Sequence, residues 1–152
     1  MKGPGEKGAM HSLAHQKANA LSAMKTITEE VVSRLEKGGE DEAQFAGILQ
    51  LLDKRSAYME AVGQLDKRFA FLQDSGYEPQ AEETRRISLE QDTIRALLTC
   101  IQTLDEQGIR TLEQARCRLM ESIKEVKDGR KSIQAYAPVP EEEEGRRVDT
   151  LR

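Results

Sequence analysis

The back half of the chain reads PQAEETRRISLEQDTIRALLTCIQTLDEQGIRTLEQARCRLMESIKEVKDGRKSIQAY, from Pro79 to Tyr136. Its apolar residues recur at intervals of three, four and seven, which is the pattern of one long amphipathic helix. Pro79 suits the first turn of a helix, where its missing N–H costs nothing. The pattern predicts a helix over residues 79–136, the longest of the chain, with Gly108 as the point where it would kink.

Two more helices are expected before this one. The spacing of Leu21, Met24 and Ile27 predicts a helix over 12–37 that starts near Ser12, and Gly38 follows it as a stop signal. A second apolar stripe predicts a helix over 41–73. We assign the members of that stripe to the core: Phe45, Ile48, Leu49, Leu52, Met59, Val62, Leu65, Phe69 and Leu72.

These elements predict an all-α fold, an elongated antiparallel three-helix bundle with a long C-terminal helix. Charged residues make up 33% of the chain and aromatic residues only 4%, which favours a thin bundle with wide solvated faces. We expect a disordered, Gly-rich start over residues 1–10, a helical bundle over 11–137, and an acidic flexible tail over 138–152.

Several classes of function lack support in the sequence. No nucleophile elbow, P-loop or dinucleotide-binding loop is present, so we do not expect an enzyme or a cofactor. His11 and His15 have the spacing of a helical metal pair, but the sequence fixes no third ligand, so no metal is expected. A net charge of −4 disfavours nucleic acid as a partner, and no apolar run reaches the roughly 18 residues of a membrane span. Cys100 and Cys117 are read as reduced thiols of a cytoplasmic protein.

The unequal lengths of the three helices identify a candidate binding surface. The last helix is too long for the other two to cover it along its whole length, and exposed apolar surface often marks a binding site. Packing of the same residues into the bundle core is the alternative, and both readings stay open. The candidate partner-binding residues are Ile109, Leu112, Leu119, Ile123, Val126, Ile133 and Tyr136.

The chain resembles the small helical export chaperones of bacterial flagella, of the FliT type and its FlgN-type relatives. The likeness covers about residues 20–136 and excludes both the Gly-rich start and the acidic tail. The segments that carry it are Leu51-Leu-Asp-Lys-Arg55 followed by Tyr58-Met59 and Leu65-Asp66, then Ile101-Gln-Thr-Leu-Asp105 with Leu112 and Leu119, and the basic helix end Gly129-Arg-Lys-Ser-Ile-Gln-Ala-Tyr136.

This resemblance implies a cytoplasmic chaperone that holds the C-terminal segment of a late flagellar subunit, prevents its premature assembly and aids type III export. FliT-type members hold the filament-cap protein, which is the favoured client here, and FlgN-type members hold the hook–filament junction proteins. Some FliT-type members also contact the export ATPase complex and a transcription regulator. Two alternatives compete with this reading: a coiled-coil scaffold that self-associates, as a homodimer would, and a regulator that acts by protein contact.

Overall fold

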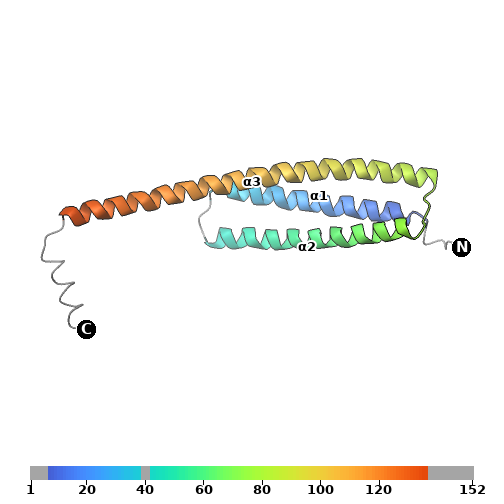
Figure 1. Cartoon of the computed structure of the whole chain (residues 1–152), viewed down its shortest axis with the longest axis horizontal. Helices are drawn as coiled ribbons and strands as arrows, with labels where there is room; N and C mark the ends of the chain where they lie inside the picture. The colour runs from blue at the N-terminus through green and yellow to red at the C-terminus, as the bar shows by residue number, and fades with distance from the viewer. Residues whose placement is uncertain (1–6, 39–41, 137–152) are drawn as a thin grey trace, which may run out of the picture. The chain divides into compact units, whose positions relative to one another are not determined.

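The computed structural model describes residues 7–38 and 42–136, with side chains as far as Ile133. These residues form three α-helices, α1 (Ala9–Glu36), α2 (Glu42–Asp74) and α3 (Ala81–Tyr136), and no strand occurs within the described ranges (Figure 1). The predicted all-α class and the predicted three-helix bundle are therefore confirmed, as is the great length of the last helix.

Glycines with positive φ close the first two helices. Gly38 has φ 67° and follows α1, and Gly76 has φ 81° and follows α2. Only glycine adopts this left-handed conformation without a Cβ penalty, and it allows the next amides to turn back onto the last carbonyls of the helix. After α2, the Tyr77 N–H donates to the Leu72 carbonyl at 3.2 Å, which is the bond that a Schellman motif makes.

The start of α1 differs from the prediction. The helix begins at Ala9 instead of near Ser12, and the Ser12 N–H donates to the Gly8 carbonyl within the first turn. Ala9 and Met10 belong to the segment expected to be disordered, yet they are helical, and Met10 is buried. Residues 1–6 and the predicted acidic tail lie outside the described residues.

Contacts between Cα atoms divide the chain into two compact units, Met1–Leu112 and Glu113–Arg152. In the first unit, α1 and the first part of α3 run in the same direction, while α2 runs in the opposite direction (Figure 1). The centre of the core joins Leu21 and Met24 of α1 to Ile94 and Ile101 of α3, with Val62 of α2 packed against them. All three helices therefore share one apolar core.

Polar contacts fix the register of α1 against α3. His15 lies beside Glu90 near the start of the pair, and Gln107 donates to Glu36 at its end. Glu36 is the last residue of α1, so α1 ends level with Gln107. Gly108, the predicted kink position, is buried, and a Cβ there would lie 3.5 Å from the Val32 side chain. The helical assignment of α3 runs through Gly108 without interruption.

The orientation of α2 corrects the predicted core. Ile48 and Leu65 are buried as expected, but Leu52 is 37% exposed. Three other members of the predicted stripe are also exposed: Phe45 at 57%, Leu49 at 52% and Met59 at 54%. The half-buried positions on this helix include Leu51 and Arg55. Helix α2 carries apolar residues on two sides, and the side that faces the bundle includes an arginine.

Candidate partner-binding surface

The C-terminal part of α3 exposes every side chain that the structure describes there. From Glu113 to Ile133 no residue is even half-buried. The apolar side chains in this stretch include Leu119 at 62% exposed, Ile123 at 47% and Val126 at 56%. These apolar side chains are therefore exposed in the second unit, and their role in partner binding stays a prediction.

Six of the seven predicted binding residues are exposed on α3, and we call this set the α3 stripe. It consists of Ile109, Leu112, Leu119, Ile123, Val126 and Ile133, all exposed. The side chain of Tyr136, the seventh residue, lies outside the described side chains. Met120, at 58% exposed, adds an apolar side chain that the prediction did not include.

The spacing of the α3 stripe is that of a coiled-coil seam. Leu112, Leu119, Val126 and Ile133 follow one another at every seventh residue, which is one of the two core positions of a heptad. The other core position holds, in order, Ile109, Arg116, Ile123 and Arg130. Such a seam is built to pack against another helix, since knobs on one helix need holes on a second.

Charge around the α3 stripe is mixed rather than uniformly basic. Residues 110–131 hold seven Lys and Arg side chains and four Asp and Glu side chains, a net charge of +3. Acidic residues such as Glu121 and Glu125 stand among the basic ones on the same exposed helix. A phosphate backbone would meet repulsion as well as attraction here.

A second exposed apolar surface lies on α2, and we call it the α2 stripe. Its members are Phe45, Leu49, Leu52 and Met59, four predicted core residues that are exposed in the structure. Their spacing of three, four and seven gives the same periodicity as a buried face, so periodicity alone does not distinguish the two. Exposure in the folded chain makes this stripe a competing candidate for partner binding.

A bidentate ion pair joins α2 to α3. Arg55 Nη1 lies 2.6 Å from Asp105 Oδ1, and Nη2 lies 2.7 Å from Oδ2. The Arg55 side chain is 18% exposed and that of Asp105 is 35% exposed. The hydrogen bonds that Arg55 donates to the Asp105 carboxylate raise the pKa of Arg55. Both residues belong to segments that carry the family resemblance, and the structure gives them a role in holding the bundle together.

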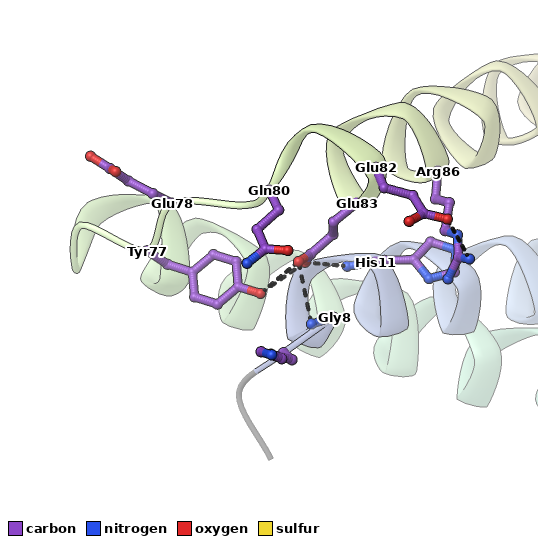
Figure 2. A pocket seen from close by; sticks show the side chains of 9 residues that line it. Gly8, His11, Tyr77, Glu78, Gln80, Glu82, Glu83 and Arg86 are labelled. Carbon is purple, nitrogen blue, oxygen red and sulfur yellow. Dashed lines mark hydrogen bonds and ion pairs between the residues drawn. The ribbon is translucent and has the colours of Figure 1, made fainter. Parts of the chain in front are cut away.

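Glu83, in the first turn of α3, caps the first turn of α1 (Figure 2). It accepts hydrogen bonds from the backbone N–H of Gly8 at 3.3 Å and of His11 at 3.4 Å. The Tyr77 hydroxyl donates to the same carboxylate, at 2.8 Å and 2.9 Å from its two oxygens. Burial, and then the hydrogen bond to Glu83, raise the pKa of Tyr77. The first helical amides thus obtain their acceptor from a residue 72 or more positions away.

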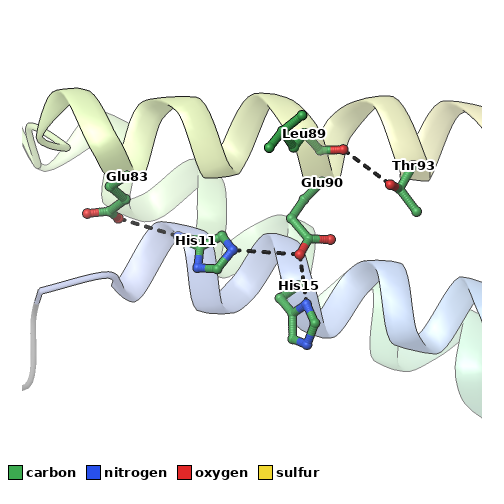
Figure 3. A network of polar contacts seen from close by, with 6 residues as sticks. All are labelled: His11, His15, Glu83, Leu89, Glu90 and Thr93. Atoms are coloured by element: carbon green, nitrogen blue, oxygen red, sulfur yellow. Dashed lines mark hydrogen bonds and ion pairs between the residues drawn. The ribbon is translucent and has the colours of Figure 1, made fainter.

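The two histidines noted in the sequence meet a single carboxylate (Figure 3). His15 Nδ1 lies 2.7 Å from Glu90 Oε1, and His11 Nε2 lies 3.6 Å from the same oxygen. The spacing of the two histidines could not predict Glu90 as their shared partner, because Glu90 lies on α3. Among the described residues, no group of three or more His, Cys, Asp and Glu side chains is arranged to hold a metal ion.

None of the three described helices holds an apolar window long enough to cross a membrane. Cys100 and Cys117 are both exposed free thiols.

Comparison of the chain with protein-family models, with curated proteins and with solved structures returned no match.

Proposed function

We propose that this protein is a cytoplasmic export chaperone that binds the C-terminal segment of a late flagellar subunit, with the filament-cap protein as the favoured client. The client segment would lie as an amphipathic helix on the α3 stripe. One observation carries the proposal: the seam of apolar side chains at heptad spacing from Ile109 to Ile133 is exposed to solvent in the folded chain.

The energetics of this surface suit capture followed by release. Burying a side chain such as Ile123 or Val126 contributes roughly 1.5–3 kcal/mol. Ordering a disordered client segment costs about 2–5 kcal/mol or more of the gross interaction. The difference leaves moderate affinity, as a chaperone needs if it is to deliver its client to a type III export gate. Contact with the export ATPase complex is part of the same proposal and rests on the resemblance alone.

Calorimetry tests the proposal with a peptide that covers the C-terminal segment of the filament-cap protein from the same genome. The variant Ile123→Ser/Val126→Ser should lose several kcal/mol of binding free energy, since two anchors of roughly 1.5–3 kcal/mol each are removed. Its melting temperature should stay close to that of the wild type, because both side chains are exposed.

The α2 stripe supplies a matched control. Leu49→Ser/Met59→Ser also replaces two exposed apolar side chains, in the first unit of the chain. This variant should bind the peptide as the wild type does. Loss of binding in the α2 variant with retention in the α3 variant would move the site to α2. Failure of the wild type to bind either the filament-cap peptide or a hook–filament junction peptide would refute the chaperone function.

A further inference from the structure

The second core position of the α3 seam carries arginine in alternate heptads. Along the chain this position holds Ile109, Arg116, Ile123 and Arg130. Both arginines are exposed. In a parallel pair of identical helices each core residue meets its own copy. Arg116 would then face Arg116 and Arg130 would face Arg130, which places like charges in contact inside the seam. A parallel self-pairing is therefore strongly disfavoured.

An antiparallel pair of the same helices removes this repulsion. When two copies lie antiparallel with the two-fold axis level with Glu121, residues at one core position of the heptad pack against residues at the other core position of the second copy. Leu119 then packs on Ile123 of the second copy. Arg116 faces Val126, and Arg130 faces Leu112, so that no arginine meets another arginine. Ile109 and Ile133 close the two ends of the seam.

The residues that flank the seam are complementary in this arrangement. Glu113 comes beside Lys127 of the second copy, and by symmetry the pair occurs twice. Arg130, opposite Leu112, also lies next to Glu113 of the second copy. Opposite charges at these flanking positions set the partner and the orientation of a coiled coil. Met120 meets its own copy at the centre of the same edge.

The other edge of the seam is lined by small residues. Ala115 comes opposite Gly129 of the second copy, and Ser122 meets Ser122 on the two-fold axis. Small side chains here let the two backbones approach closely, and the charges on the first edge then define the pairing. The closed symmetry of such a contact is that of the commonest homodimers, in which one patch meets itself.

Neighbouring registers fit less well. A shift of one heptad toward the bundle would bring Asp105 into the seam, and Asp105 already pairs with Arg55. A shift of one heptad the other way would place Glu113 opposite Gln134 and lose both charge pairs. The register centred on Glu121 uses the exposed stripe and keeps the complementary charges.

We infer that a second copy of this chain covers the α3 stripe, through an antiparallel coiled coil of α3 with α3 centred on Glu121. The two arginines in the seam make the dimer weaker than a fully apolar coil would be, since polar core positions give register at a cost in stability. If the proposed function holds, the dimer also shields the client surface, so that client and second copy compete for the same stripe.

Sedimentation of the full chain across micromolar concentrations tests the dimer without any client. The wild type should sediment as a dimer, and Ile123→Ser/Val126→Ser as a monomer. Glu113→Lys should weaken association by about tenfold, since two attractive pairs become repulsive. Leu49→Ser/Met59→Ser should remain a dimer. A monomeric wild type at every concentration, or a dimer lost only in the α2 variant, would overturn the inference.

Disulfide trapping tests the orientation. Cys100 and Cys117 are exposed and are first changed to serine. In that background Ser122→Cys lies on the two-fold axis of the antiparallel dimer and should cross-link on mild oxidation. Arg116→Cys would meet its own copy only in a parallel dimer, so it should not cross-link. Cross-linking of Arg116→Cys in place of Ser122→Cys would refute the antiparallel arrangement.

These experiments distinguish failure of the dimer from failure of the chaperone function. A monomeric wild type that still binds the filament-cap peptide removes the dimer and leaves the chaperone function in place. A dimer that cross-links through Ser122→Cys, yet binds neither flagellar peptide, removes the chaperone function and leaves the self-association.

Discussion

The ion pair between Arg55 and Asp105 should contribute measurably to the stability of the bundle. Two short charge-assisted hydrogen bonds, at 2.6 Å and 2.7 Å, join the two helices. Fully exposed pairs contribute about 0–1 kcal/mol, and breaking a buried pair costs about 3–5 kcal/mol. With side-chain exposures of 18% and 35%, this pair falls between those limits. We expect Asp105→Ala to lower the free energy of unfolding by about 2 kcal/mol.

Arg55→Ala should cost a similar amount, about 2–3 kcal/mol, for a different reason: it removes the packing of the aliphatic stem but leaves no charge without a partner inside the bundle. In Asp105→Ala, by contrast, the charged Arg55 remains half-buried. Its Nε is already without a hydrogen-bond partner among the described residues, and the loss of Asp105 removes the two acceptors of its Nη atoms as well. The double alanine variant should therefore lose less than the two single variants together, with a coupling energy of about 1–1.5 kcal/mol.

Urea unfolding followed by circular dichroism measures all four proteins. An additional variant, Arg55→Met/Asp105→Leu, should lie within about 1 kcal/mol of the wild type, because apolar residues of similar volume often replace an ion pair without loss. Additivity of the two single alanine variants within about 0.5 kcal/mol would contradict the reasoning, since it would show that the contact between the helices carries no energy of its own.

Three further outcomes follow from the structure. Leu21→Ala, in the core at 2% exposure, should cost about 2–5 kcal/mol in thermal or urea unfolding, whereas Leu52→Ala should cost less than about 1 kcal/mol; equal losses would contradict the observed orientation of α2. Glu83→Ala should cost about 1 kcal/mol and speed amide exchange at His11 far more than at Leu21, since it removes the acceptor for the first turn of α1. The raised pKa of Tyr77 means that the folded chain holds the phenol proton more tightly than the unfolded chain, so this stability is present below about pH 10 and is lost as pH rises through the folded pKa. The alkaline fall in unfolding free energy should therefore be shallower in Tyr77→Phe, and an unchanged slope would contradict that assignment.

The helices could be predicted from the sequence because their signals are local. Gly38 and the turn at Gly76 stop α1 and α2 through backbone conformations that glycine adopts most readily. The start of α1 lies at Ala9, three residues before the predicted start near Ser12, because the signal for it is not local. Its amides are capped by Glu83, which lies 75 positions from Gly8, and no local pattern contains that information.

The side of α2 that faces the core could not be predicted. Phe45, Leu49 and Leu52 repeat as regularly as residues that are buried, and the true inner side carries Arg55. An arginine on an inner face is acceptable only because Asp105 of α3 pairs with it. That pairing depends on how α2 and α3 pack together, which the local sequence does not contain. The residues of the α3 stripe are exposed, as the unequal helix lengths indicate, and their role in binding a partner stays a prediction.

The parallel arrangement of α1 and α3 also constrains the order in which the chain acquires its structure during synthesis. Residues that meet across this pair are 71 to 75 positions apart, as in Gln107 with Glu36 and Glu90 with His15. At roughly 5–20 residues per second, α1 leaves the ribosome about 4–15 s before its partner segment is made. Helix α2 leaves the ribosome after α1 and before α3, and it can cover part of the apolar face of α1. Leu21 and Met24 stay incompletely covered until Ile94 and Ile101 of α3 are made. We therefore expect the nascent chain to expose these apolar side chains for several seconds, an interval in which a ribosome-associated factor can bind them.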